Sequence, residues 1–164
     1  MKFYKSLMSL LFIAGIYSAN VIADPPKNYP FVAFDEGLVE ASKNNKKIFL
    51  YYGRYGCGYC GKVNAETFSN KILREQLIKN YVLVYLDGES GKRLQLPGGE
   101  QITEMELGAR LNVFSTPVFL YMEPDGKVIF RAPGYKTVDD FQSFNRYILE
   151  GHYKNKNINE FLGK

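Results

Sequence analysis

The sequence predicts one α/β domain in which a central mixed β-sheet carries helices on both faces. The continuously apolar runs at residues 48–52 and 81–86 have the length and composition of buried strands, the first of which we expect to begin at Lys47. Helical patterns fill the chain between them, and strands joined by a long crossover of this kind lie parallel in one sheet. The runs at residues 118–122 and 127–131 flank a tight Glu-Pro-Asp-Gly turn and predict an antiparallel hairpin. Parallel and antiparallel pairing together make the expected sheet mixed.

Polar capping residues mark where most of the expected helices begin. We expect helices over residues 35–44, 62–68, 70–80, 103–111 and 137–150. The expected N-caps are Asp35, Ser69, Thr103 and Thr137. Thr103 is followed three residues later by Glu106, which is the spacing of a capping box. In the last of these helices one face is apolar and Gly151 can end the helix.

Two regions lie outside this regular pattern. Residues 89–101 are charged and rich in glycine, and a small hairpin of residues 93–96 against 100–102 is the structure expected there. Connections of this length are either binding loops or floppy insertions, and the sequence leaves both open. The tail beyond residue 151 is expected to dock as a short helix, because apolar residues recur at helical spacing: Ile158, Phe161 and Leu162.

The N-terminal stretch has the pattern of a secretory signal peptide. Lys2 and Lys5 precede an apolar core at residues 7–16, and Val21-Ile22-Ala23 offers small or aliphatic residues at a cleavage site. An uncleaved anchor is the alternative, but this core is shorter than the roughly 20 residues of a spanning helix. We therefore expect a signal peptide at residues 1–23, cleavage near Ala23, one mature domain at residues 24–164 and a periplasmic location.

The charge balance excludes several kinds of partner. The full chain has a net charge of +4, which becomes +2 when Lys2 and Lys5 leave with the predicted signal peptide. So small an excess does not indicate a nucleic-acid partner or an anionic membrane surface. We expect a monomer that binds no nucleic acid.

The two cysteines of the chain, Cys57 and Cys60, form a Cys-x-x-Cys motif where a predicted strand gives way to a helix. A thiol at a helix N-terminus is stabilised as the thiolate by unpaired backbone N–H groups and the helix dipole, and a second cysteine one turn on can resolve a mixed disulfide. Zinc needs about four ligands, and His152 is the one histidine. Haem attachment needs a histidine where Gly61 stands. A structural disulfide would close only a very short loop. A redox pair without metal or other cofactor is the interpretation that remains.

At this point the chain resembles the thioredoxin superfamily over residues 31–150. The resemblance rests on Cys57-Gly58-Tyr59-Cys60 after a buried strand and on Thr116-Pro117 before the hairpin. It implies a thioredoxin-like fold, a cis peptide bond before Pro117, and a loop at Thr116 and Pro117 that faces the cysteines. It also makes Gly58, Tyr59, Thr116 and Pro117 the candidate substrate-binding residues and Cys57 and Cys60 the catalytic ones.

Shorter motifs resemble the exported bacterial thioredoxins called SoxW-like. They are the run Glu66-Thr67-Phe68-Ser69, the run from Arg131 to Tyr135, the glycine-rich insertion and the aromatic and basic tail. They favour an exported member of the superfamily.

The chain departs from cytoplasmic thioredoxin around the cysteines. Tyr51 stands where that family has a buried aspartate, Gly56 replaces the tryptophan, and no proline lies between the cysteines. The proton acceptor for Cys60 is therefore open. Glu66 is expected to point away and pair with Lys62 on the surface.

Two other charged residues remain candidates near the cysteines. Asp87, at the end of a predicted strand, is another possible proton acceptor. Arg54 either helps hold the Cys57 thiolate or is an ordinary solvated loop charge.

These features predict an extracytoplasmic thiol–disulfide oxidoreductase that reduces disulfides of exported proteins. With no histidine between the cysteines, a reductant is favoured over a strong oxidant, and a membrane thiol electron donor would have to recharge it. A disulfide-forming oxidase is the alternative among enzymes. A Cu(I)-binding thiol chaperone is the alternative outside them, because soft thiolates suit that metal.

Overall fold

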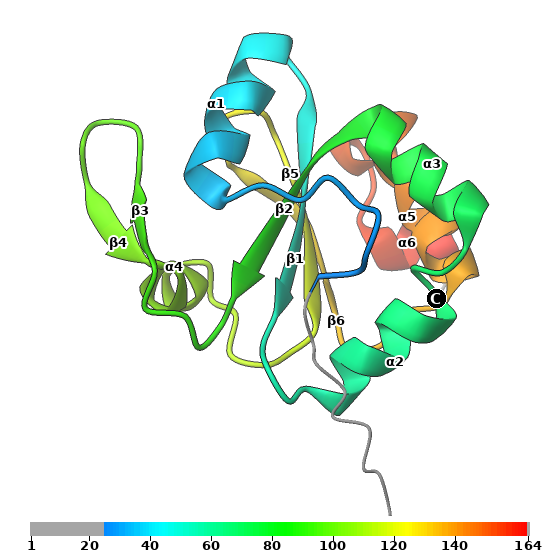
Figure 1. The fold of residues 1–164 in the computed structure, drawn as a ribbon. Coiled ribbons are helices and arrows are strands. Elements are labelled where there is room, and N and C mark those ends of the chain that lie inside the picture. Colours follow the sequence, from blue (N-terminus) through cyan, green and yellow to red (C-terminus); the bar gives the residue numbers. More distant parts are fainter. Residues whose placement is uncertain (1–24, 164) are drawn as a thin grey trace, which may run out of the picture.

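A computed structural model describes residues 25–163, so the predicted signal peptide at residues 1–23 lies outside the described residues. At its centre is a four-stranded sheet in the order β2-β1-β5-β6 (Figure 1). β1 is parallel to β2 and antiparallel to β5, and β6 returns antiparallel to β5. The predicted mixed sheet is confirmed, with the strands β1 Lys47–Gly53, β2 Tyr81–Asp87, β5 Val118–Met122 and β6 Val128–Pro133.

Helices cover both faces of the sheet. In Figure 1, α2, α3 and α5 lie on one side, whereas α1, α4 and a small second sheet of β3 and β4 lie on the other. Among residues 25–163, no helix combines the length and the apolar character that crossing a membrane requires. The bounds are α1 Phe34–Asn44, α2 Gly58–Glu66, α3 Lys71–Asn80, β3 Arg93–Gln95, β4 Gln101–Thr103, α4 Glu104–Arg110, α5 Val138–Leu149, a 3-10 turn η1 His152–Lys154 and α6 Ile158–Leu162.

Alternation along the central strand β1 divides the core into two halves. Phe49 and Tyr51 point toward α2, α3 and α5, where the buried cluster is rich in aromatic rings. Ile48 and Leu50 point toward α1 and α4, where the buried cluster is mainly aliphatic. All four side chains are fully buried. Each such side chain stabilises the fold by roughly 1.5–3 kcal/mol.

Two of the predicted N-caps are wrong by one or two residues. Asp35 lies inside the first turn of α1, whose N-cap is Ala33, and its carboxylate instead accepts a hydrogen bond from the backbone N–H of Gln95 at 2.9 Å. Ser69 does not cap α3 either, because the side chain of Asn70 accepts the hydrogen bond from the Leu73 N–H. A one-residue choice between adjacent capping residue types, such as Ser69 and Asn70, cannot be made from pattern alone, and Ala33 has no side chain that could mark it as a cap.

The other helix starts follow the sequence more closely. Thr103 and Thr137 are the N-caps of α4 and α5, and both form complete capping boxes. The predicted hairpin at residues 93–102 is present as β3 and β4. The helix after the cysteines begins earlier than expected, at Gly58, and ends at Glu66.

β6 runs two residues past its predicted end at Arg131, through Ala132 to Pro133, which pairs with Val118. Proline is tolerated there because β6 is an outer strand of the four-stranded sheet, and its free side needs no backbone donor.

The segment before α1 joins the opposite outer strand. The backbone N–H of Val32 donates to the carbonyl of Leu83 at 2.9 Å, and the Val32 carbonyl accepts from Tyr85 at 3.2 Å. Val32 thereby forms a parallel bridge with Val84 of β2. Nearer the start, the hydroxyl of Tyr29 donates to the carbonyl of Phe68, just after α2. The lead-in to the domain is thus fixed to the sheet and to the helix that carries the cysteines.

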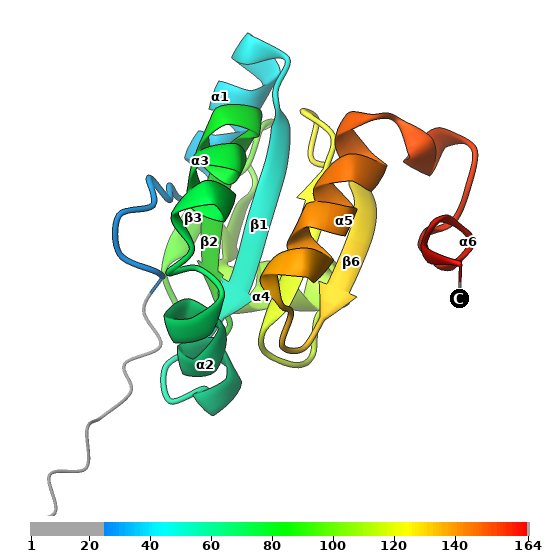
Figure 2. The ribbon, with the colours of Figure 1, turned by 90° about the vertical axis from the view of Figure 1, so that its right-hand side faces the viewer.

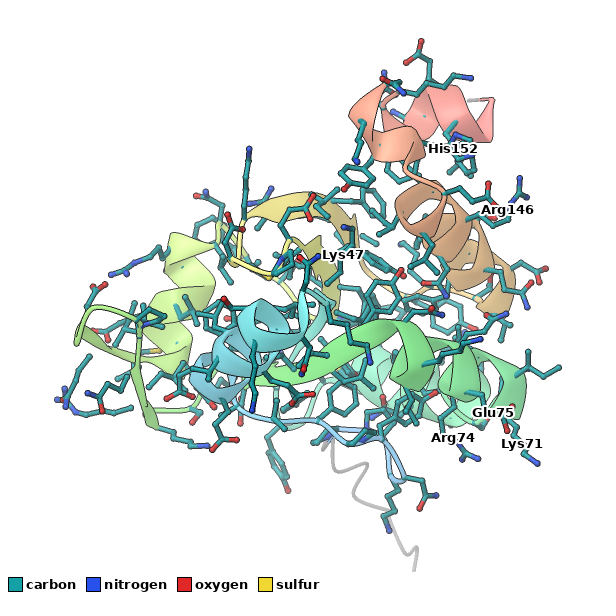
Figure 3. All side chains as sticks on the ribbon, turned by 90° about the horizontal axis from the view of Figure 1, so that it is seen from above. Lys47, Lys71, Arg74, Glu75, Arg146 and His152 are labelled. Atoms are coloured by element: carbon teal, nitrogen blue, oxygen red, sulfur yellow. A yellow bond between two sulfur atoms is a disulfide. The ribbon has the colours of Figure 1, made fainter. Side chains whose placement is uncertain are left out.

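The C-terminal tail docks as a short helix, as predicted. The Phe161 ring of α6 lies under the guanidinium of Arg146 at 5.6 Å and beside the ring of His152 at 4.8 Å. Figure 3 shows Arg146 and His152 on neighbouring parts of α5 and the tail. A second contact comes from Tyr153, whose hydroxyl donates to the carboxylate of Glu123 at 2.8 Å. Lys47 of β1 donates to the same carboxylate, which ties the tail to the sheet.

Candidate active site

The two cysteines lie at the carboxyl end of β1, joined as a disulfide with their Cα atoms 5.2 Å apart. The strand ends at Gly53, and a short turn through Gly56, with a φ of 69°, leads into α2. Glycine fits that left-handed conformation without strain. The backbone N–H of Cys57 donates to the carbonyl of Arg54 at 3.4 Å and closes the turn.

Cys57 is the N-cap of α2, a helix of nine residues. Its Sγ accepts a hydrogen bond from the backbone N–H of Cys60 at 3.1 Å. A side chain in this position faces the unpaired N–H groups and the positive end of the helix dipole, which lower the pKa of a free thiol. The predicted placement of Cys57 at a helix N-terminus is confirmed.

The two sulfur-bearing residues differ in exposure. Cys57 keeps 5% of its surface exposed, whereas Cys60 is fully buried in the aromatic half of the core. Gly58 and Tyr59 between them are exposed, and Tyr59 leaves 65% of its surface in solvent. A second polypeptide can therefore approach the disulfide from the side of Cys57.

The loop before β5 lies at the same end of the sheet. Val118 pairs with Tyr52, so Thr116 and Pro117 come next to the point where β1 ends (Figures 1 and 2). The peptide bond between Thr116 and Pro117 is cis, the geometry that the thioredoxin resemblance implies. Pro117 is buried and Thr116 is half-buried.

A third segment, between β6 and α5, links the proline loop to the redox helix. The backbone N–H of Gly134 donates to the Pro117 carbonyl at 2.8 Å. Next in the chain, the hydroxyl of Tyr135 donates to the carboxylate of Glu66 at the end of α2, also at 2.8 Å. The hydroxyl of Thr67 donates to the carbonyl of Lys136 at 2.7 Å. The loop and helix that frame the disulfide are thus held by one connector.

The expected pairing of Glu66 with Lys62 needs correction. Both side chains contact Tyr135 instead: the carboxylate accepts from its hydroxyl, and the ammonium lies 4.8 Å from its ring centroid. Tyr135 is distant in sequence and follows no local pattern, so the pairing could not be found before the fold was known.

Tyr51 lies beneath the redox pair, at the position where cytoplasmic thioredoxin has a buried aspartate. Its hydroxyl is 3.5 Å from the carbonyl oxygen of Cys60, and the side chain is fully buried. Burial, and then the neighbouring Tyr85, raise the pKa of Tyr51 well above its usual value. The phenol therefore stays protonated at neutral pH and is not a proton acceptor for Cys60.

Asp87 stays a candidate proton acceptor, at the end of β2 opposite Gly53 of β1. Its carboxylate accepts a hydrogen bond from the Glu89 backbone N–H at 3.0 Å. Tyr52, in the aliphatic half of the core, has a raised pKa. Burial is the main cause, and the negative charge of Asp87 is the next one.

Arg54 forms an ion pair with Glu89, with 2.8 Å between Nη1 and Oε1, and both side chains are about half exposed. The interpretation of Arg54 as a solvated loop charge is therefore favoured over a contact with the Cys57 thiolate. Glu89 comes from the loop after β2, which is why the sequence did not reveal the pair.

No group of three or more His, Cys, Asp or Glu residues within residues 25–163 is arranged to hold a metal ion. His152 instead pairs with Glu150 at 2.9 Å in the tail.

A Cys-x-x-Cys pair whose first cysteine caps a helix, at the carboxyl end of β1 in a sheet with this topology, defines a thiol–disulfide oxidoreductase of the thioredoxin superfamily. The chain belongs to the thioredoxin-like family, since the sequence model of the thioredoxin-like domain matches residues 34–149. No match to the chain was found among curated proteins.

Solved structures support the same fold. A thioredoxin-fold protein from Helicobacter pylori is 25% identical, with a TM-score of 0.64 over 73% of this chain and 79% of the other. A thioredoxin from Thermus thermophilus is 20% identical, with a TM-score of 0.60 over 74% of this chain and 87% of the other. A protein named DsbH oxidoreductase is 16% identical, with a TM-score of 0.56 over 93% of this chain and 96% of the other.

Proposed function

We propose that this protein is an exported reductase of protein disulfides, with Cys57 as the attacking residue and Cys60 as the resolving one. The observation that carries the proposal is the position of Cys57 Sγ, which caps α2 and accepts the Cys60 N–H at 3.1 Å. The same N–H groups would stabilise the thiolate once the disulfide is reduced. The greater exposure of Cys57 supports the order of the two roles.

The reaction proceeds by two thiol–disulfide exchanges. The Cys57 thiolate attacks one sulfur of the partner's disulfide, which forms a mixed disulfide and releases the partner's other sulfur as a thiolate. The Cys60 thiolate then attacks Cys57 Sγ and displaces the partner's remaining sulfur. The partner gains two electrons and, after protonation, two thiols, while Cys57 and Cys60 return to the disulfide form. Solvent supplies and takes up the protons.

The surface around the pair supports a polypeptide substrate. Thr116 and Pro117 adjoin the end of β1, and Gly58 and Tyr59 are exposed between the cysteines. We assign these four residues to the binding of the partner's backbone beside its disulfide. Each catalytic cycle leaves the pair oxidised, so a membrane thiol electron donor would recharge it.

The reducing direction and the exported location belong to the same proposal. With Gly58 and Tyr59 between the cysteines, no cationic side chain stands there to over-stabilise the Cys57 thiolate. A reduction potential near thioredoxin's value of about −270 mV against glutathione would support a reductase, and one near about −120 mV an oxidase. Mass spectrometry of the exported protein should find its N-terminus after Ala23, and light scattering should find a monomer.

Trapping tests the cysteine roles directly. Cys60→Ala should accumulate mixed disulfides with partner proteins, because the resolving thiol is gone while the attacking one remains. Cys57→Ala should abolish insulin reduction and trap nothing. The double variant Cys57→Ala/Cys60→Ala controls for adventitious capture. Turnover like that of the wild type by either single variant would refute the proposal.

A further inference from the structure

A groove between α3 and α5 is lined mainly by carboxamide side chains. Its volume is about 370 Å³, and its wall includes Gln76 and Asn80 of α3 and Gln142 and Asn145 of α5. Asn80 directly precedes β2, so the groove reaches the end of the sheet where β1 and β2 begin, whereas the redox pair follows the other end of β1. We call it the carboxamide groove.

Two residues of this wall carry a buried polar atom that has no hydrogen-bond partner within residues 25–163. The atoms are Nδ2 of Asn145, which is a donor, and Oε1 of Gln76, which is an acceptor. Asn145 is only 5% exposed, and its Oδ1 accepts a long hydrogen bond, of 3.4 Å, from the hydroxyl of Tyr121. Because buried polar groups are nearly always paired, these two atoms indicate a ligand that offers both an acceptor and a donor.

The charged residues of the carboxamide groove, Arg146 and Glu150, are opposite in sign, and both contact the tail. The guanidinium of Arg146 lies 5.6 Å from the ring centroid of Phe161, and the carboxylate of Glu150 pairs with His152 at 2.9 Å. The groove therefore offers a ligand the hydrogen bonds of neutral carboxamides, without an excess of charge.

A second hollow, of about 270 Å³, continues from the carboxamide groove. Asn80 and Leu149 line both of them. The charged residues of the second hollow are all lysines, namely Lys46, Lys47 and Lys154, and no acidic residue of the described chain lines it. Figure 3 looks onto this end of the molecule, where Lys47 is labelled. We call it the lysine hollow.

Two of the three lysines keep their charge available to an anion. Lys47 is paired with Glu123 at 3.0 Å, but within residues 25–163 neither Lys46 nor Lys154 forms an ion pair. The ammonium of Lys46 donates to the carbonyl of Ile78 at 3.0 Å, and that of Lys154 lies 6.0 Å from the ring centroid of Tyr153. Since an ammonium group has three donors, both can still donate to an anion in the lysine hollow.

We infer that the carboxamide groove and the lysine hollow together bind a soluble sugar phosphate. Each sugar hydroxyl can both donate and accept, so one ring can offer an acceptor to Asn145 and a donor to Gln76. The groove is within the range of roughly 300–1,000 Å³ typical of small-ligand sites. Phosphate suits the lysine hollow, because lysine binds phosphate as a point charge. This binding function is separate from the proposed reductase activity, since the site lies at the other end of β1.

The test is isothermal titration calorimetry of the protein at low ionic strength, where the attraction between exposed charges is least screened. The ligands are glucose 6-phosphate, glucose 1-phosphate and mannose 6-phosphate, and the references are glucose and inorganic phosphate. At least one sugar phosphate should bind at least about tenfold more tightly than either reference, because a linked ligand occupies both hollows at once.

Variants locate the ligand on the protein. The double variant Lys46→Gln/Lys154→Gln should weaken binding of the best sugar phosphate at least about fivefold, because charge-assisted hydrogen bonds to the phosphate are lost. Gln76→Met, which keeps the length of the side chain and removes its acceptor, should weaken it at least about threefold. Lys71→Gln/Lys92→Gln is the matched control, because it removes the same charge from two exposed lysines that line neither hollow. Its affinity should stay within twofold of the wild type.

Several outcomes would overturn the inference. If no sugar phosphate binds more tightly than inorganic phosphate, the lysine hollow holds an adventitious ion only. The inference also fails if Lys46→Gln/Lys154→Gln or Gln76→Met keeps the affinity of the wild type, or if the control variant loses as much affinity as the lysine variant. Insulin reduction is measured separately on the same proteins and should be equal in all of them, so the proposed reductase function stands or falls independently of this site.

Discussion

The hydroxyl of Tyr51 lies 3.5 Å from the carbonyl oxygen of Cys60, on the buried side of the redox pair. Around it are the rings of Phe119, at 4.9 Å between centroids, and Tyr85, at 5.3 Å. The thioredoxin pattern has a carboxylate in this place, whereas here a protonated phenol fills an aromatic pocket. The resolving cysteine therefore has an apolar neighbour with a single weak polar contact.

We predict that Tyr51→Phe destabilises the fold by less than about 1 kcal/mol, because the hydrogen bond is long. Insulin reduction should stay within threefold of the wild type, since the phenol is not a base. Tyr51→Asp should cost several kcal/mol, and more at neutral pH than at about pH 4, because burial penalises the charged form. Urea unfolding measures both. A loss of activity above tenfold in Tyr51→Phe would contradict this role.

A second prediction concerns alkaline pH. Burial raises the pKa of four tyrosines in the core, namely Tyr29, Tyr51, Tyr81 and Tyr121. Their phenols ionise above about pH 10 in the unfolded chain but stay neutral when folded, so the stability they contribute is present below that pH and is lost as the pH rises. The loss is about 1.4 kcal/mol per pH unit for each group.

The free energy of unfolding should therefore fall steeply above about pH 10. Urea titrations followed by circular dichroism measure it, and absorbance near 295 nm should show the phenols ionising together with unfolding. Tyr81→Phe should reduce the slope by one group at little cost at neutral pH, because the Tyr81 hydroxyl has no hydrogen-bond partner within the described chain. Ionisation of all four tyrosines in a folded protein would be the contrary result.

The capping of α3 gives a third prediction. Asn70→Ala should destabilise the protein by about 1 kcal/mol, because the Asn70 side chain accepts the Leu73 N–H at 2.9 Å. Ser69→Ala is the matched control, and it should change the stability by less than about 0.5 kcal/mol, since Ser69 is exposed and does not cap the helix. Equal losses in the two variants would show that the cap is assigned to the wrong residue.

The fourth prediction concerns the two hydrogen bonds that Glu123 accepts from Lys47 and Tyr153, which we call the clamp of the tail. Partial burial alone would raise the pKa of Glu123, but hydrogen bonds from Tyr153 and Lys47 outweigh it and lower the pKa. The carboxylate thus stabilises the fold above the unfolded-state pKa of about 4.3, and this stability is lost as the pH falls through the lower folded-state value.

Glu123→Gln and Tyr153→Phe should each cost about 1 kcal/mol at neutral pH and open the tail to faster hydrogen exchange at residues 152–162. The difference between Glu123→Gln and the wild type should vanish at low pH. Tyr55→Phe, which removes an exposed hydroxyl elsewhere, is the control. Unchanged exchange in the tail of both clamp variants would show that other contacts hold it.

The sequence predicted the features that depend on neighbouring residues. Unbroken apolar runs located the strands, a capping box located the start of α4, the N-cap Thr137 located the start of α5, and the spacing of Cys57 and Cys60 identified the redox pair. Contacts between distant segments were not predictable in this way. The Glu66–Tyr135 hydrogen bond and the Arg54–Glu89 ion pair each bring together side chains far apart in the chain. Such contacts follow from packing, which carries no signature in the local pattern.

Val32, hydrogen-bonded on both sides of its peptide unit to β2, has a consequence for how molecules of this protein meet one another. Unpaired backbone on an outer strand is a template for adding strands from other copies, and this is a common first step toward fibres. Over the stretch beside Val84, that template is already occupied by the protein's own lead-in. The backbone contact of Val32 therefore hinders the addition of strands from other copies along β2. The free edge of β6 ends in Pro133, which has no N–H to donate, and this hinders strand addition there.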